Sequence, residues 1–511
     1  MISKLASSSI LGVEGYIVEV ETDVRAGLPG TIIVGLADTA VQESKERVKS
    51  AIKNSGFVYP TQKIVVNLAP ADIKKVGPVY DLPIALGILI ASEQIEPKNL
   101  KDFLIVGELS LDGSVKPIHG VLPYTISAYK SGYSKIIVPK DNSVEASLVE
   151  GIKVYPVSNL KEAIDVLINP SEFLPLSFDI NKFKSEPDFK GLDFNEIKNQ
   201  HYAKRCLEIA AAGSHNILMI GPPGSGKTML ARRIPTILPP MTFKESLETS
   251  KIYSVAGLLP DKSGLITTRP FRSPHHSISN AGLVGGSSIP KPGEVSLSHN
   301  GVLFLDELLE FKREVLEVLR QPLEDRVITI ARAQLSITYP ANFMLVASLN
   351  PCPCGFRGDS VKQCVCTTTQ VERYWHKLSG PLLDRIDIHL EVPRLRQDEL
   401  LKETKEESSY EIRKRVIKAR SIQLERFKES GIYSNSSMSP ADIKKYCKLD
   451  NESKTLLRLA INKLNLSARA YDRILKVART IADLAGSKYI QASHIAEAIQ
   501  YRTLDRQRIA A

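Results

Sequence analysis

One eight-residue segment has the residue types needed to bind the phosphates of a nucleotide. It consists of Gly221, Pro222, Pro223, Gly224, Ser225, Gly226, Lys227 and Thr228. Glycines let backbone N–H groups turn inward around phosphate oxygens, and the positive end of a following helix strengthens the attraction. In this pattern the lysine reaches the β- and γ-phosphates, and the next hydroxyl can ligate Mg²⁺. The segment therefore predicts a site for a nucleoside triphosphate with Mg²⁺.

Apolar segments on both sides of this motif predict the elements that position it. His215–Ile220 predicts a buried strand, and Met229–Ile234 predicts a helix directly after the motif. A glycine-rich turn without a ligand is the alternative, but the strand–loop–helix context removes most chance matches. We therefore expect a phosphate-binding loop between a strand and the N-terminus of a helix.

Two neighbouring acids follow a second apolar run. Val302–Leu305 predicts a buried strand, and Asp306 and Glu307 come directly after it. Phosphoryl transfer to water needs a metal ligand and a group that activates the water. We expect Asp306 to hold Mg²⁺ together with Thr228, and Glu307 to polarise the attacking water. Because many buried strands end in acids, this prediction depends on the phosphate-binding motif that precedes it.

Two further polar residues complete the predicted site. Asn350 follows the apolar run Phe343–Leu349, at a place where its side chain could sense the γ-phosphate. Arg385 lies between Asp384 and Asp387, where it can face a neighbouring copy of the chain. An arginine supplied in this way stabilises the transition state and links hydrolysis to assembly. A surface salt bridge with one of the two aspartates is an equally good interpretation.

Four of the six cysteines lie within fifteen residues: Cys352, Cys354, Cys364 and Cys366. Thiolates in two close pairs could form a tetrahedral Zn²⁺ site with a structural role, because four protein ligands leave no open position for catalysis. The gap inside each pair is tighter than the usual two residues. Four reduced thiols that pack together are the alternative. The remaining Cys206 and Cys447 are expected to pack in cores.

Composition and charge indicate a globular protein with a basic C-terminal part. In 511 residues, 43% hydrophobic and 24% charged content excludes wholesale disorder. Without a long apolar run or many cysteines, we expect a cytoplasmic protein that does not cross a membrane. Residues 394–511 hold 25 Lys and Arg against 15 Asp and Glu, which accounts for the whole net charge of +10. Such a part fits contact with a polyanion such as nucleic acid, or a solvated helical surface.

Changes in periodicity along the chain predict a multidomain α/β fold. Residues 1–168 alternate β-branched runs with helical stretches, which predicts an α/β domain that starts with a strand. Residues 169–190 lose this periodicity and are expected to be a linker. Residues 191–393 form a second α/β unit with a Cys-rich insertion at 352–366. The basic residues 394–511 are helical, at Tyr410–Phe427, Glu452–Asn465, Ala468–Ala485, which Ser467 would cap, and Ala492–Tyr501.

Several long motifs together resemble the magnesium-chelatase-like AAA+ family, specifically its ComM/YifB branch. They are HNILMIGPPGSGKTMLARR, RPFRSPHHSIS, GEVSLSHNGVLFLDEL, LVASLNPCPCG, SGPLLDRIDIHLEV and SARAYDRILKVARTIADL. The resemblance covers nearly the whole chain. It implies a hexameric ring that hydrolyses ATP with Mg²⁺, with residues 394–511 as the helical lid. The ComM members are described as DNA helicases that drive branch migration during natural transformation.

Carried over to this sequence, the resemblance implies roles that spacing left open. It makes Asn350 the first sensor, Arg385 the arginine finger and Arg469 the second sensor, while Arg473 lies on the same predicted helix. In a ring, the stretch before Asp306 and the hairpin predicted at Val327–Tyr339 would lie near the central pore. Their candidates for DNA contact are Arg272, His275, His276, Lys291 and Arg332. Contacts with nucleotide or between subunits are the alternative.

The N-terminal domain is similar to the Lon-protease-type domain of the ribosomal-protein-S5-like fold. The similarity rests on Gly107–Gly120, GELSLDGSVKPIHG. A protease of this type needs a serine nucleophile and an activating lysine. The nucleophile segment Gly77–Ile84 has no serine, and the lysine position is Leu122. We expect a docking or ring-forming module without peptidase activity.

These observations favour an ATP-driven motor that acts on DNA, such as a branch-migration helicase. Two other functions stay open: the ATPase subunit of a chelatase that inserts Mg²⁺ into a porphyrin, and a nucleotide-controlled scaffold with slow hydrolysis. The Lon-like domain and the lack of an acidic or proline-rich connector argue against the chelatase. Glu307 and Arg385 argue against the scaffold.

Overall fold

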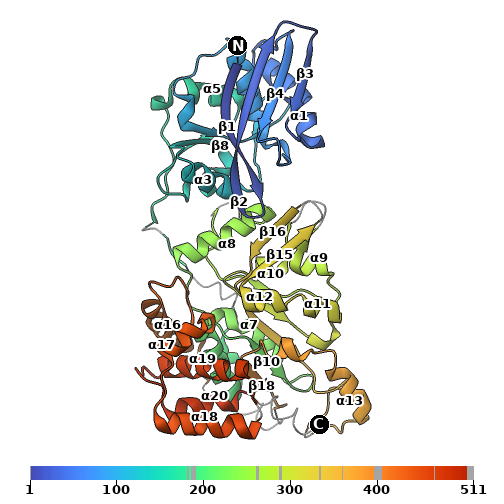
Figure 1. Ribbon diagram of the computed structural model, residues 1–511, viewed down its shortest axis with the longest axis vertical. Helices are drawn as coiled ribbons and strands as arrows, with labels where there is room; N and C mark the ends of the chain where they lie inside the picture. Colours follow the sequence, from blue (N-terminus) through green and yellow to red (C-terminus); the bar gives the residue numbers. More distant parts are fainter. Residues whose placement is uncertain are drawn as a thin grey trace. The chain divides into compact units, whose positions relative to one another are not determined.

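The computed structural model describes residues 2–180, 183–185, 191–260, 264–286, 291–332, 335–359, 361–395, 406–464 and 466–502. The chain divides into two compact units, whose elements are labelled in Figure 1. Unit 1 consists of Met1–Lys184 and Phe243–Ile266, and unit 2 of Ser185–Thr242 and Thr267–Ala511. Among the described residues, no helix combines the length and the apolar composition needed to span a bilayer.

A seven-stranded sheet forms the framework of unit 1, in the order β3-β4-β2-β1-β5-β8-β9. Its strands are β1 (Ile2–Leu11), β2 (Glu14–Arg25), β3 (Gly30–Val34), β4 (Lys63–Ala69), β5 (Phe103–Ile105), β8 (Lys135–Pro139) and β9 (Lys153–Val157). The β1/β2 and β2/β4 pairs are antiparallel, and the other four pairs are parallel. A hairpin of β6 (Glu108–Leu109) and β7 (Val115–Lys116) lies outside this sheet. The predicted mixed α/β character of this part is confirmed.

One wholly buried helix lies at the centre of the core of unit 1. The helices in the N-terminal part of this unit are α1 (Thr39–Asn54), α2 (Asp81–Ala91), α3 (Val121–Lys130), α4 (Ser143–Ser147) and α5 (Leu160–Ile168). Every residue of α2 is buried, and the helix packs against α1, β1 and β2. Burial of each Leu or Ile side chain contributes roughly 1.5–3 kcal/mol, so the apolar run LPIALGILIA fixes this helix in the core.

One helix from the middle of the chain also belongs to unit 1. The helix α8 (Phe243–Ala256) packs against α3, and the Ser254 hydroxyl donates a hydrogen bond to the buried Glu145 carboxylate. Lys251 Nζ lies 2.6 Å from a carboxylate oxygen of Glu14. The sequence predicted that residues 191–393 form one domain, whereas Phe243–Ile266 pack into unit 1. The contacts of α8 join residues more than a hundred positions apart, which local periodicity does not reveal.

Part of the predicted linker also packs onto unit 1. The side chains of Phe173, Phe178 and Phe183 are partly buried against its core. The rings of Phe178 and Phe243 stack with their centroids 6.1 Å apart. Phe173, Phe178 and Phe183, which interrupt the periodicity after residue 168, are therefore packing residues.

Unit 2 is built on a five-stranded parallel sheet, in the order β11-β14-β17-β10-β18. Its strands are β10 (Ile217–Ile220), β11 (Phe271–Arg272), β14 (Val302–Leu305), β17 (Met344–Leu349) and β18 (Ile388–Glu391). Because all five strands run in the same direction, their carboxyl ends meet at one edge, where ligands bind in open α/β sheets. The strand predicted before Asn350 lies between the other two predicted strands.

The helical C-terminal region shares one hydrophobic core with this sheet and its helices. The helices next to the sheet include α6 (His201–Gly213) and α7 (Lys227–Ile237), and those of the C-terminal region are α16 (Ser409–Arg426), α17 (Pro440–Tyr446), α18 (Asn451–Leu464), α19 (Ala468–Leu484) and α20 (Ala492–Gln500). Both α16 and α19 pack against α6. Ser467 Oγ accepts a hydrogen bond of 3.2 Å from Ala470 N, which confirms the predicted N-cap of α19.

Small elements lie between β11 and β17. They are α9 (Asn280–Val284), β12 (Gly285–Gly286), β13 (Lys291–Pro292), α10 (Glu294–Leu297), α11 (Arg313–Glu317) and α12 (Arg320–Asp325). The predicted hairpin is confirmed: β15 (Val327–Arg332) pairs antiparallel with β16 (Leu335–Pro340). Two short helices, α13 (Thr368–Trp375) and α14 (Gly380–Leu383), follow β17.

Candidate active site

The predicted phosphate-binding segment forms a loop between β10 and α7. Gly224 and Gly226 have φ values of +77° and +91°, in the left-handed region that residues with a side chain rarely adopt. A Cβ atom on Gly221 would lie 2.1 Å from the carbonyl oxygen of Val392. Gly226 is also the N-cap of α7, so the helix begins directly at the loop. A glycine-rich turn that leads directly into a helix N-terminus is the backbone arrangement that binds anions such as phosphate.

The Lys227 ammonium group lies between this loop and the end of β17. Its Nζ donates hydrogen bonds to the carbonyl oxygens of Gly221 (2.7 Å) and Pro222 (3.0 Å) and to Asn350 Oδ1 (3.2 Å). Burial lowers the pKa of Lys227, while the charges of the two nearby acids oppose that shift. The predicted sensor Asn350 and the predicted phosphate-binding lysine are therefore direct neighbours.

The two acids after β14 have different surroundings. Thr228 Oγ1 donates a hydrogen bond of 2.8 Å to Asp306 Oδ2, and the Ser348 hydroxyl donates to Asp306 Oδ1. Glu307 is exposed, and its φ of +51° and ψ of +52° are left-handed. Holding a residue other than glycine in this region costs about 1–3 kcal/mol and is common at active sites. Asp306 thus faces the loop, while the Glu307 carboxylate stays accessible to water.

These residues fit Mg²⁺ and a triphosphate. A hydroxyl oxygen of Thr228 and a carboxylate oxygen of Asp306 already lie at hydrogen-bond distance, and both are oxygen ligands of the kind that Mg²⁺ prefers. Within the described parts of the chain, the Lys227 ammonium group donates its hydrogen bonds to neutral oxygens. Phosphate oxygens would attract it more strongly than these neutral acceptors do.

Arg385 lies in a cluster of arginines around Glu324. One oxygen of Glu324 pairs with Arg385 Nη2, and the other lies 3.5 Å from Arg469 Nη2. Burial lowers the pKa of Arg385, and the positive charges of Arg469, Arg320 and Arg473 lower it further. The half-exposed Glu324 carboxylate thus pairs with two guanidinium groups, and two further arginines act on Arg385, which makes the cluster attractive to a further anion such as a phosphate.

Asp387, one of the two partners considered for Arg385, instead pairs with Arg473 of α19. Its Oδ2 accepts a hydrogen bond of 2.9 Å from Asn216 N and lies 3.6 Å from His215 Nδ1. Burial alone would raise the pKa of Asp387, but Arg473, His215 and the Asn216 N–H hold it well below its usual range. Of the two arginines proposed as second sensor, Arg473 is engaged by this carboxylate and Arg469 is half exposed.

The residues predicted to contact DNA lie in different environments. Arg272, in β11, pairs with both carboxylate oxygens of Glu294, at 2.6 and 2.7 Å. The rings of His275 and His276 lie 4.0 Å apart. Lys291 in β13 is exposed. Arg332 ends β15, and only its backbone belongs to the described structure.

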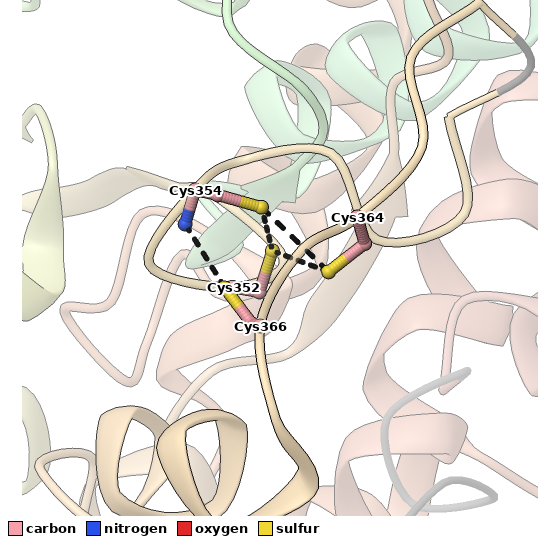
Figure 2. A group of neighbouring side chains, drawn as sticks. All are labelled: Cys352, Cys354, Cys364 and Cys366. Carbon is pink, nitrogen blue, oxygen red and sulfur yellow. Dashed lines mark hydrogen bonds between the residues drawn. The ribbon is translucent and has the colours of Figure 1, made fainter.

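The four clustered cysteines lie with their sulfur atoms close together (Figure 2). Cys352 Sγ is 3.3 Å from Cys354 Sγ and 3.6 Å from Cys364 Sγ, and the latter two are also 3.6 Å apart. The Cys354 N–H donates to Cys366 Sγ at 3.4 Å. The fold therefore gathers the two predicted pairs into one group. Cys206 and Cys447 are buried in the core of unit 2, as predicted.

The positions that would carry a protease dyad hold no serine and no lysine. Asp81 is buried and accepts hydrogen bonds from Arg47 at 2.7 and 3.1 Å. Leu122 is fully buried. Within Gly77–Ile84 the chain contains neither Ser, Thr nor Cys, so the usual nucleophiles of peptide hydrolysis are missing there.

Four contacts of the site involve residues that sequence reasoning did not assign. Ser348 donates a hydrogen bond to Asp306, and Glu324 lies between Arg385 and Arg469. Gln200 Nε2 donates to the carbonyl oxygen of Ser225 (2.9 Å), and Arg394 Nη2 donates to the carbonyl oxygen of Pro223 (3.0 Å). A lone serine in the apolar strand MLVASL was an available signal for the first contact. The other three join distant parts of the chain and leave no local pattern.

The strand order, the loop, and the acids and Asn350 at one edge of the sheet define a P-loop ATPase of the AAA+ class. Family models match most of the chain: "Magnesium chelatase, subunit ChlI" over residues 193–400, "Subunit ChlI of Mg-chelatase" over 20–142 and "Magnesium chelatase, subunit ChlI C-terminal" over 406–502.

Two full-length relatives identify the branch. Competence protein ComM of Haemophilus influenzae is 46% identical over 506 residues, which cover 98% of this chain and 97% of the relative. The uncharacterized protein YifB of Escherichia coli is 43% identical over 508 residues, covering 99% and 98%. Lon protease 2 of Bacillus subtilis is 32% identical over 188 residues, covering 33% of each chain. The chain therefore belongs to the ComM/YifB family of magnesium-chelatase-like AAA+ ATPases.

Proposed function

We propose that this protein is a ring-forming motor, a hexamer as the family resemblance implies, that uses Mg-ATP hydrolysis to move on DNA and drive branch migration. The observation that carries the proposal is the arrangement of Lys227, Thr228, Asp306 and Asn350 at one sheet edge, with the exposed Glu307 beside them. Similarity along the full length to a protein named for competence supports DNA as the partner. The basic excess in residues 394–511 supports it as well.

Each residue of this edge has a distinct part in the proposed hydrolysis. The loop N–H groups and Lys227 bind the phosphates, and Thr228 and Asp306 hold Mg²⁺, which when bound neutralises charge on the phosphate oxygens. The oxygen of the attacking water bonds to the γ-phosphorus, and Glu307 accepts a proton from this water. The bond to the bridging oxygen then breaks and ADP leaves. Asn350 contacts the γ-phosphate and reports whether it is present.

A second copy of the chain completes the proposed site. Arg385 turns from Glu324 to the γ-phosphate bound by a neighbouring subunit, and Arg469 contributes as second sensor. The clustered positive charges around Glu324 support this assignment, since an incoming phosphate would relieve their repulsion. Hydrolysis would therefore depend on ring assembly.

The proposed DNA contacts come from the elements between β11 and β17. His275, His276, Lys291 and Arg332 are the direct candidates: the two histidines lie in a short loop, Lys291 begins β13, and Arg332 ends the hairpin strand β15. Arg272 contributes less to DNA binding as long as its Nε and Nη2 atoms donate hydrogen bonds to the two carboxylate oxygens of Glu294. Movement of these segments during the ATP cycle would advance the DNA.

A branch-migration assay on a four-way DNA junction tests this function. We expect the wild-type chain to convert the junction to products only with ATP, and Lys227→Ala to abolish conversion. Lys101→Ala removes an exposed lysine of unit 1 and should leave conversion unchanged. Equal conversion by Lys227→Ala, or none by the wild type on any branched DNA, would overturn the proposal.

The descriptions of the matching family models favour a second candidate, the ATPase subunit of a metal chelatase. This function predicts that a porphyrin substrate and a partner protein stimulate ATP hydrolysis and that DNA does not. A nucleotide-controlled scaffold would instead turn over slowly and ignore both. Steady-state phosphate release with single-stranded, duplex and branched DNA, and separately with porphyrin, distinguishes the three.

The Lon-like part of the chain is proposed to be a docking or ring-forming module. The buried Asp81–Arg47 pair and the buried Leu122 support this proposal, because neither position offers a nucleophile or its activator. A peptidase assay on unfolded protein should therefore show no cleavage above that of the Lys227→Ala chain.

A further inference from the structure

We infer that Cys352, Cys354, Cys364 and Cys366 bind one Zn²⁺ ion, and that this ion holds their loop against the phosphate-binding loop. The first part of the inference does not depend on the proposed DNA motor. The second part depends only on nucleotide binding at Gly221–Thr228.

The positions of the sulfur atoms fit a tetrahedral metal site. With a Zn–S distance of about 2.3 Å, the sulfurs of such a site lie about 3.8 Å apart. Three of the sulfur pairs are 3.3–3.6 Å apart, and all four atoms lie within 4.8 Å of one another. Figure 2 shows the side chains of Cys352, Cys354 and Cys364 turned toward one another. A small outward shift of the sulfurs would accommodate the ion.

A backbone hydrogen bond favours a metal-bound thiolate at the fourth sulfur. The N–H of Cys354 donates to Cys366 Sγ at 3.4 Å. Hydrogen bonds of this kind orient a metal ligand and stabilise its negative charge. This hydrogen bond joins the first cysteine pair to the second and needs no bound ion.

Hydrophobic packing alone does not explain how this loop is held. Its two valines, Val361 and Val365, are 64% and 83% exposed. Cys354, Cys364 and Cys366 are only half-buried, so the sulfurs are not the centre of an apolar core. A loop with so little buried apolar surface needs another constraint to keep one conformation, and a bound metal supplies it.

The same loop touches the nucleotide site directly. A Cβ atom on Gly355 would lie 2.7 Å from Pro223 Cδ, so the two loops are in close contact. Arg394 joins them: its Nη2 donates to the carbonyl oxygen of Pro223 at 3.0 Å, and its Nη1 lies 3.7 Å from Asp359 Oδ2. Asn350, which binds Lys227, precedes Cys352 by two residues. Fixing the cysteines thus fixes one side of the phosphate-binding loop.

Metal analysis of the full-length protein tests the zinc site. Protein purified under reducing conditions from zinc-supplemented cells should contain one zinc per chain, and Co²⁺ substitution should give a thiolate-to-cobalt charge-transfer band. The double variant Cys364→Ser/Cys366→Ser should lose both signals. Cys364→His should keep the metal, since histidine is also a zinc ligand, and Cys447→Ala should keep it because that thiol lies elsewhere. Wild-type protein that holds no zinc and gives no cobalt band would overturn the site, as would metal retained by the double serine variant.

Nucleotide binding tests the coupling. Chelator-stripped wild-type protein should bind a fluorescent ATP analogue on the order of tenfold more weakly, and added Zn²⁺ should restore the affinity. Gly355→Ala should weaken nucleotide binding while leaving zinc content at one per chain, because it disturbs the contact with Pro223 and keeps all four ligands. Circular dichroism checks that the chelator-stripped wild-type protein and the Gly355→Ala variant remain folded. Unchanged nucleotide affinity in folded, zinc-free protein would overturn the coupling, whether or not the chain acts on DNA.

Discussion

At the residue scale, Asp306 and Glu307 show how the end of one strand can place two neighbouring acids in different surroundings. The β14/β17 register places Leu305 beside Ala347, and Asp306 therefore comes next to Ser348. Glu307 has a left-handed backbone conformation and is exposed. One acid is thus held by hydroxyl groups, and the other stays free to meet water.

The variant Glu307→Gln should separate binding from hydrolysis. An amide keeps the size of the side chain but cannot accept a proton from water, so we expect ATP turnover to fall by about 10²–10⁴-fold. Binding of a fluorescent ATP analogue should change by less than about threefold. Glu310→Gln, an exposed acid three residues later, is the matched control and should retain turnover. A Glu307→Gln enzyme with normal turnover would remove Glu307 from its proposed role.

How far the sequence predicts single residues depends on the distance of their partners along the chain. Lys227, Thr228, Asp306 and Asn350 belong to local motifs, and the fold brings them together. Glu324 could not be found in this way, because it lies 61 positions from Arg385 and no pattern joins them. The left-handed conformation of Glu307 could not be predicted from the sequence either, because glycine is the residue that usually marks left-handed backbone.

At the scale of elements, the contact between the phosphate-binding loop and β18 sets a strict limit on side-chain size. A methyl group on Gly221 would collide with the carbonyl oxygen of Val392, and it would also approach Ser225 Oγ. Gly221→Ala should therefore lower the stability of the protein by about 1–3 kcal/mol and weaken ATP binding. Urea unfolding followed by the fluorescence of Trp375, the single tryptophan, measures the first effect.

Gly30→Ala is the matched control for this substitution. Gly30 lies at the start of β3, and an added Cβ would meet no atom within 4 Å. Its unfolding midpoint and ATP affinity should equal those of the wild type. If Gly221→Ala behaved in the same way, the close packing of the loop on the end of β18 would be refuted.

The buried network that joins α19 to β10 should make unit 2 sensitive to acid. Burial lowers the pKa of His215; Lys476 and Arg473 act in the same direction, and Asp387 opposes them. Below about pH 6.5 the unfolded chain then binds more protons at this histidine than the folded chain does. Stability must therefore fall as the pH drops below that value. Below about pH 4, protonation of Asp387 should add to the loss, because its folded pKa is also lowered.

Trp375 lies in unit 2, so its fluorescence in urea at pH 7.5 and 5.5 measures this effect. We expect a lower free energy of unfolding at the lower pH, and a smaller difference in His215→Gln, whose amide can still reach Thr480. His376→Asn, at an exposed position, should show the wild-type difference. A wild-type difference that survives unchanged in His215→Gln would contradict the account.

Element types were predictable where the periodicity was strong, and element order was not. The helices predicted at Ala468–Ala485 and Ala492–Tyr501 are α19 and α20, and each ends one residue before its predicted last residue. The position of β17 between β10 and β14 follows from long-range pairing, which no local pattern encodes. For the same reason the sequence did not reveal that α8 packs with unit 1.

At the scale of the whole molecule, the chain combines an ATPase unit with a second unit whose segment Gly77–Ile84, where a Lon-type protease would carry its nucleophile, contains neither Ser, Thr nor Cys. The similarity to ComM and YifB spans both units. The proposed motor needs one more level of organisation, because Arg385 completes a site only on a neighbouring copy.

Mixing two inactive variants tests this central claim. Glu307→Gln and Arg385→Ala should each be nearly inactive alone. In randomly mixed rings, roughly a quarter of the subunit interfaces would join an intact Glu307 with an intact Arg385 from the adjacent copy. We therefore predict that ATP turnover in an equimolar mixture rises to a substantial fraction of the wild-type rate. A mixture that forms mixed rings yet stays as inactive as its components, or a wild-type monomer that hydrolyses ATP at full speed, would contradict the account.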